Sequence, residues 1–164
     1  MNTHKRIAIV IGVIFCTLVK LHTSGLSDDT HLLRGLEGVQ VIVEEIQPEV
    51  ERDGLTKAQL KTDVELALRM SGIKLLSAEE RVQILSQPIL YLNVNVMKTQ
   101  GSGYVFNVDL SARESGITLR GGMTWAPTWE WGYVGITPSL ASIRDYVKDM
   151  VDRFINAYLT ANPK

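Results

Sequence analysis

Apolar and polar residues alternate through the middle of the chain. Between Ile89 and Met97 every even-numbered position is apolar, and polar or bulky residues fill most positions between them. The run 104–113 alternates in the same way, after a turn-forming Thr-Gln-Gly-Ser-Gly at 99–103. A period of two residues is that of a β-strand buried on one side. These runs predict an antiparallel hairpin with one apolar and one polar face.

Three other runs predict further strands. Residues 39–46 alternate, and residues 73–76 form a short, mostly apolar run that predicts a buried strand. Residues 117 to about 134 predict a strand after a turn at 114–116, broken or bulged near Gly121-Gly122 and Pro127.

Helices are expected where the apolar spacing changes to three and four residues. The first begins with Thr-Lys-Ala-Gln at 56–59, a capping-box sequence, and runs to about Ser71 before Gly72. A second capping box at 77–80 opens a short helix that ends at about Ser86.

The last helix carries the clearest amphipathic pattern. Thr137 is its expected cap and Pro138 its first residue, and its apolar stripe runs from Leu140 to Tyr158 opposite a charged face. The elements therefore follow the order β-α-β-α-β-β-β-α. This order predicts an α+β two-layer sandwich, a mostly antiparallel sheet with helices on one face.

The N-terminus has the three parts of a secretory signal. Lys5 and Arg6 precede the apolar run Ile7–Val19, and Thr-Ser-Gly at 23–25 supplies small residues for cleavage. We therefore expect a signal peptide over 1–25, a flexible leader over 26–37 and a single domain over 38–164. The expected location is exported, in the periplasm. The alternative is anchorage in the inner membrane through Ile7–Val19, and membrane contact is expected only if the signal is uncleaved.

The composition then limits the kinds of catalytic or metal site that the chain can form. The sole cysteine, Cys16, and two of three histidines lie in the signal, which leaves His31 as the only histidine of the remainder. This argues against thiol nucleophiles, disulfides, Cys/His zinc sites and most histidine-based catalysis. The signal holds three of the 17 basic residues and none of the 18 acidic ones, so acidic residues exceed basic ones by four in the remainder. We expect no nucleic-acid partner, since that needs a basic surface, and no cofactor or metal.

All three tryptophans lie in one segment. Trp125, Trp129, Trp131 and Tyr133 have the same parity, so an unbroken strand would place them on one face. Such residues are typical anchors for a protein partner, and they also suit sugar or lipid contacts. The alternative is that these side chains pack on the sheet, either beneath a helix or over its open face.

The polar hairpin face is the second candidate site. If the loop 99–103 sets the register, Asn95 lies opposite Asn107 and Asn93 lies opposite Asp109. Four amide or carboxylate groups would then form a patch able to hold a polar ligand or, weakly, a cation. The alternative is an ordinary solvated sheet face.

Several segments resemble known exported proteins. The run 53–69 (DGLTKAQLKTDVELALR) with Ser-Gly-Ile at 71–73, the hairpin residues 91–95 and the ending 147–156 are similar to a family of exported bacterial proteins without an assigned activity. More loosely, the order of elements resembles the amino-terminal domain of the periplasmic protein TolB and related envelope modules. That resemblance implies a binding or assembly part, and it transfers no site residue.

These observations favour a non-enzymatic, exported binding or assembly module that contacts an envelope protein. It would present a sheet edge or the tryptophan segment, and the long final stripe also allows a homodimer. The alternative is a small-ligand-binding protein or a carboxylate-dependent hydrolase that uses the polar hairpin face.

Overall fold

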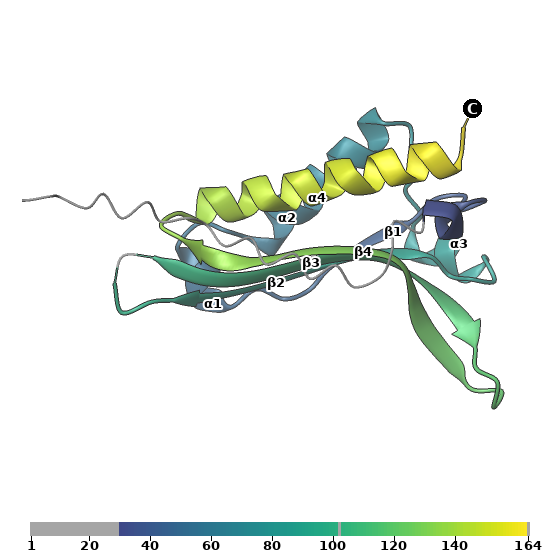
Figure 1. Ribbon diagram of the computed structural model, residues 1–164, viewed down its shortest axis with the longest axis horizontal. Helices are drawn as coiled ribbons and strands as arrows, with labels where there is room; N and C mark the ends of the chain where they lie inside the picture. The colour runs from purple at the N-terminus through teal and green to yellow at the C-terminus, as the bar shows by residue number, and fades with distance from the viewer. Residues whose placement is uncertain (1–29, 102, 164) are drawn as a thin grey trace, which may run out of the picture.

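The computed structural model describes residues 30–101 and 103–163 (Figure 1). The predicted signal peptide and the first residues of the predicted leader lie outside the described residues. The elements are η1 (Thr30–Leu33), β1 (Gln40–Val43), α1 (Pro48–Arg52), α2 (Lys57–Met70), α3 (Ala78–Val82), β2 (Ile89–Lys98), β3 (Tyr104–Ile117), β4 (Met123–Thr137) and α4 (Leu140–Ala161).

Within the described residues, four strands form one sheet in the order β1-β2-β3-β4. β1 runs parallel to β2, and the other two pairings are antiparallel. α2 and α4 lie together on one face of this sheet (Figure 1). The predicted α+β sandwich with a mostly antiparallel sheet is confirmed. The outer face, as we call the side of the sheet opposite α2 and α4, carries the polar residues of the hairpin.

The capping signals are confirmed at two helices. In α2 the Thr56 hydroxyl accepts a hydrogen bond from the Gln59 amide at 3.2 Å, and the Gln59 side chain accepts one from the Thr56 amide. Gly72 follows this helix with a φ of +75°, which favours glycine. In α3 Ser77 and Glu80 make the same reciprocal pair. This helix ends at Val82, earlier than the expected end at about Ser86.

Several expected boundaries are wrong. Residues 73–76 form only an isolated bridge between Val39 and Leu75, and the run after Gln47 forms the short helix α1. β3 continues through the turn expected at 114–116, so the chain reverses only at 118–122. The last helix begins at Leu140 with Ser139 as its cap, whose hydroxyl accepts from the Ala141 amide.

The expected flexible leader is also wrong for the residues that the structure describes. Leu33 and Leu36 are buried in the core between sheet and helices. The Asn162 side chain accepts a hydrogen bond from the Gly35 amide at 2.7 Å and donates one to the Leu33 carbonyl at 2.8 Å. The burial of these leucines and the two hydrogen bonds stabilise one position of this segment, so residues 30–37 are part of the domain.

Over residues 30–101 and 103–163, no helix combines the length and the apolar character that a bilayer span requires.

Candidate functional site

The tryptophan segment divides between two faces of the sheet. The register of β3 and β4 shifts at Ala112, which pairs with Trp129, while the next residue, Arg113, pairs with Pro127. One extra residue of β4 therefore stands between these pairs, and side chains beyond it point to the opposite face. The expectation that all four aromatic residues share one face is wrong, because Trp125 lies across the bulge from the other three.

Trp129 and Tyr133 belong to the packing beneath α4. The Trp129 ring meets Phe154 edge to face, with ring centres 5.4 Å apart. Tyr133 is buried, and its ring lies 5.1 Å from that of Tyr146. Its hydroxyl donates to the Asp149 carboxylate. These contacts assign both side chains to the interior of the domain.

Trp131 is held at the margin of the same layer. It is partly buried against the core, and the Arg153 guanidinium lies 4.6 Å from its ring centre. Arg153 in turn donates to Asp149 at 2.9 Å, a bond that raises the pKa of the guanidinium. This arrangement covers one ring face of Trp131 with the protein's own side chain.

The far end of the β3–β4 hairpin projects from the sheet. We call residues 113–127 the arm. In Figure 1 the arm bends away from the rest of the sheet, toward the side opposite α2 and α4. Its base is held by Ser115, whose amide and hydroxyl donate to the carbonyls of Ser86 and Leu85 at 2.6 and 3.1 Å. The arm is thus attached firmly at its base and free of the sheet body beyond it.

The arm tip, residues 117–123, exposes large apolar side chains. Ile117 is 74% exposed, Met123 is 67% exposed and Leu119 is fully exposed. Ile117 pairs directly with Met123, so these two share one face of the arm. Trp125 lies on the same face two pairs further back, where the Arg81 guanidinium stands 5.7 Å from its ring centre.

The arm tip is closed by a hydrogen-bonded turn. The Thr118 amide donates to the Gly122 carbonyl at 2.8 Å, and the Gly121 amide donates to the Thr118 carbonyl at 2.8 Å. Gly121 has a φ of +79°, which a side chain would strain. Leu119 and Arg120 stand at the outer end of this turn. The local bonds fix the tip without support from the rest of the domain.

The predicted polar patch is brought together on the outer face. Asn95 pairs with Asn107 and Asn93 pairs with Asp109, as the loop length predicts. Asn95 donates to the Asn93 side chain at 2.8 Å, and Asn107 donates to the Asp109 carboxylate. The four groups therefore hydrogen-bond in two pairs along their own strands.

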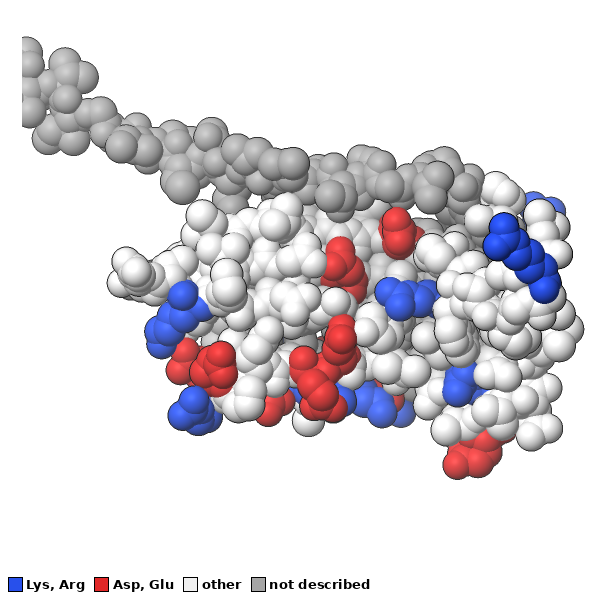
Figure 2. Space-filling view, turned by 90° about the horizontal axis from the view of Figure 1, so that it is seen from below, with Lys and Arg blue, Asp and Glu red and all other residues white. Residues whose placement is uncertain are grey.

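A polar hollow adjoins this patch. Its volume is about 220 Å³, and its lining includes Asn93, Asp109, Ser111, Arg113, Glu130 and Gly132. A side chain at Gly132 would stand 2.5 Å from an Asp109 carboxylate oxygen, so the glycine gives that carboxylate its space. The outer face appears in Figure 2, where acidic side chains gather near the middle.

Arg113 is the fixed cation of the hollow. Its Nε donates to the Ser111 hydroxyl at 2.8 Å, and its guanidinium lies 4.1 Å from the ring centre of Tyr91. No described carboxylate lies within ion-pair distance of it. Nor does any group of three candidate metal ligands occur in the part of the chain that the structure describes. The hollow suits a small polar ligand with an anionic group.

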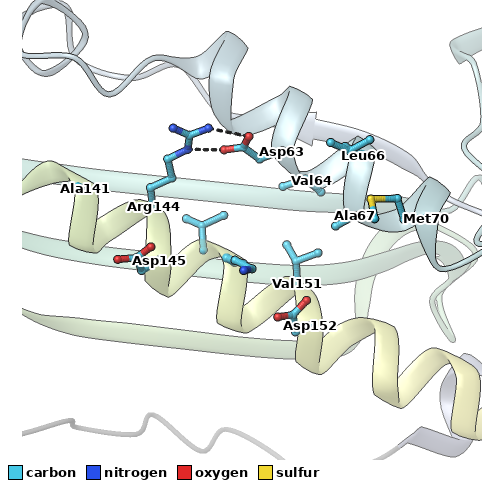
Figure 3. A pocket seen from close by; sticks show the side chains of 12 residues that line it. Asp63, Val64, Leu66, Ala67, Met70, Ala141, Arg144, Asp145, Val151 and Asp152 are labelled. Atoms are coloured by element: carbon cyan, nitrogen blue, oxygen red, sulfur yellow. Dashed lines mark hydrogen bonds and ion pairs between the residues drawn. The ribbon is translucent and has the colours of Figure 1, made fainter.

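A third candidate site is a concave groove that the sequence patterns did not predict. It lies between α2 and α4 and has a volume of about 460 Å³ (Figure 3). Apolar side chains line its floor: Val64, Ala67, Val147 and Val151. Leu66 and Met70 stand on the α2 rim, 52% and 80% exposed. Because the floor is buried and the rims are exposed, the groove opens away from the sheet.

Charged side chains border the groove on the α4 side. Arg144 reaches across one end to Asp63 of α2, with an Nη2 to Oδ1 distance of 2.8 Å and a second bond from Nε (Figure 3). This carboxylate raises the pKa of the guanidinium. Asp145, Lys148 and Asp152 complete the α4 rim. An apolar floor with a few charged groups at its edges is typical of a docking site for apolar side chains.

Comparisons with protein-family models and with curated protein sequences find no match for this chain. The arm, the hollow and the groove are the structural features that bear on its function.

Proposed function

We propose that this chain is a non-enzymatic, exported binding or assembly module whose arm contacts a protein partner. The observation that carries the proposal is the arm tip, where three large apolar side chains stand in water on an ordered turn. An ordered apolar projection is typical of an interaction site, because burying it removes apolar surface from water.

The construction of the arm favours binding over a purely structural role. Trp129 and Tyr133 pack inside the domain, whereas Ile117 and Met123 lie beyond the bulge and contribute little to the core. The turn at the tip and the bonds of Ser115 hold the arm before any partner arrives. A preformed surface loses less conformational entropy on binding than a flexible one.

Site-specific photo-crosslinking in cells tests this proposal. A photoreactive residue replaces Leu119, and the matched control replaces Ile136, which is exposed on β4 outside the arm. We expect a discrete crosslinked protein from Leu119 only, and its loss when Ile117 and Met123 are replaced by serine in a chain that still folds. The purified pair must then reproduce the contact. The absence of a crosslink at Leu119, or equal crosslinking at Ile136, would contradict the proposal.

Export rests on the sequence pattern of residues 1–25. N-terminal sequencing of the protein from fractionated cells tests it directly. A chain that begins at Leu26 in the periplasmic fraction supports a cleaved signal. A chain that retains Ile7–Val19 in the membrane fraction supports the anchored alternative.

The hollow favours a second candidate function, the binding of a small polar ligand. Arg113 is oriented by Ser111 and Tyr91, while Asp109 and Glu130 supply negative charge nearby. The ligand would carry one anionic and one cationic group, as an amino acid does. Titration with glycine and alanine, followed by NMR, is expected to shift amides around Gly132 in the wild type and not in Arg113→Gln. Identical spectra with and without these ligands would exclude amino acids as ligands.

Hydrolysis of a panel of esters and glycosides tests the carboxylate-dependent hydrolase. Activity that is lost in Asp109→Asn would favour the hydrolase over a ligand-binding protein.

A further inference from the structure

We infer that the partner of the arm is a second copy of this chain, whose α2–α4 groove receives the arm tip. The inference rests on the proposed function of the arm and identifies its partner. It joins the exposed apolar tip of the arm with the apolar groove between α2 and α4.

The two surfaces match in shape and in polarity. The arm tip is convex and presents Ile117, Leu119 and Met123. The groove is concave, and its volume of about 460 Å³ lies in the range of sites that hold several apolar groups. Leu66 and Met70 extend its apolar surface to the exposed rim. Docking would therefore remove apolar surface from water on both copies.

The charges of the two surfaces are complementary. Arg120 is the only charged residue between Ser115 and Trp129, so the arm tip is basic. The α4 rim presents two carboxylates, Asp145 and Asp152, beside one ammonium group, that of Lys148, so it is acidic overall. Neither carboxylate lies within ion-pair distance of a described cation. A guanidinium at the end of the tip would meet a carboxylate there, which favours this register over a reversed one.

The placement of the two surfaces determines the kind of assembly. The arm bends toward the outer face, whereas the groove opens on the helix side (Figures 1 and 3). The sheet lies between them, so a copy does not fill its own groove. A second copy that accepts the arm presents its own arm on the side away from the first copy. Such a contact is heterologous, and repetition adds copies head to tail instead of closing a dimer.

Two variants test the arm and the groove separately. The arm variant carries Leu119→Ser and Met123→Ser, and the groove variant carries Leu66→Lys and Met70→Lys. All four side chains are exposed, so we expect circular dichroism and thermal unfolding close to the wild type. Matched controls carry Ile136→Ser with Met97→Ser, or Ile136→Lys with Met97→Lys, at exposed positions outside both surfaces.

Sedimentation velocity of the chain, purified as the cell processes it, tests the inference. We expect the wild type and both controls to grow beyond dimers as concentration rises, and each variant alone to stay monomeric. An equimolar mixture of the two variants should form a 1:1 dimer that grows no further, because it retains one working arm and one working groove.

Three results would overturn the inference. These are a wild type that is monomeric at all concentrations, a mixture that stays monomeric, and either variant associating as the wild type does. Its failure is distinguishable from that of the proposed function. If Leu119 crosslinks to a different protein, the arm still binds a partner and only the self-contact is refuted. If Leu119 crosslinks to nothing, both fail.

Discussion

A substitution at Trp129 distinguishes a structural role of the tryptophan segment from a role in binding a partner. Its side chain lies partly buried beneath α4, edge to face with Phe154 at 5.4 Å. Replacement by alanine would remove this contact and leave a cavity between β4 and α4. Trp125, exposed in the arm, offers a matched substitution of the same type outside that layer.

The expected magnitude follows from the buried surface. An aromatic side chain buries about 150–250 Å², so a partly buried tryptophan loses roughly 120–150 Å² on truncation. At about 25 cal/mol per Å² this corresponds to about 3–4 kcal/mol of unfolding free energy. The edge-to-face pair adds about 0.5–1.5 kcal/mol, and collapse of the cavity offsets part of the sum. We expect Trp129→Ala to cost about 3 kcal/mol, and Trp125→Ala below about 1 kcal/mol.

Urea unfolding followed by far-UV circular dichroism measures both values without depending on tryptophan emission. Trp129→Phe keeps an aromatic edge against Phe154 and should recover about half of the loss. The reasoning would be refuted if Trp129→Ala lost less than about 1 kcal/mol while abolishing a partner crosslink. Trp129 would then be a binding anchor and not part of the core.

Three further predictions concern the fold. Gly72→Ala should destabilise the domain by about 1–2 kcal/mol in urea unfolding, because its φ of +75° strains any residue with a Cβ; a neutral result would show that the α2 end is not held there. Leu33→Ala should cost about 2–5 kcal/mol, since Leu33 is fully buried; a loss below about 0.5 kcal/mol would restore the leader interpretation. Hydrogen bonds from Lys98 and Tyr104 lower the pKa of Asp53. The stability from this carboxylate is therefore present above its unfolded pKa and lost as pH falls through the folded pKa. Asp53→Asn should be less stable than the wild type at neutral pH and equal to it in strong acid, and a pH-independent difference would exclude this ionisation as the cause.

Local signals in the sequence predicted much of the fold. The capping box at Thr56 and the alternation around Asn93 and Asn107 depend on neighbouring residues, and the structure reproduces both the helix start and the register. The final helix shows the limit of such signals. Thr137 and Ser139 are both acceptable caps, and pairing of Thr137 with Tyr104 across the sheet determines which one serves.

The candidate sites depended on features that a single sequence does not fix. Residues of the same parity share one face of β4 only where no residue is inserted into the strand. The bulge beside Pro127 inserts one, and it moves Trp125 to the other face. The groove depends on how α4 packs beside α2. Leu66 and Met70 stand four residues apart, off the buried stripe of α2, which was the available signal. Long apolar residues off the core stripe indicate a surface for another partner, although they do not identify it.

The two hydrogen bonds of Asn162 also bear on the order in which the chain folds. They join segments up to 129 positions apart, whereas β2, β3 and β4 pair with their neighbours in sequence. Closing so long a loop costs more entropy than closing a hairpin, so it is favourable once the intervening chain is already compact. We therefore expect η1 and the last turn of α4 to dock late and to open together in native-state hydrogen exchange, before the central strands open.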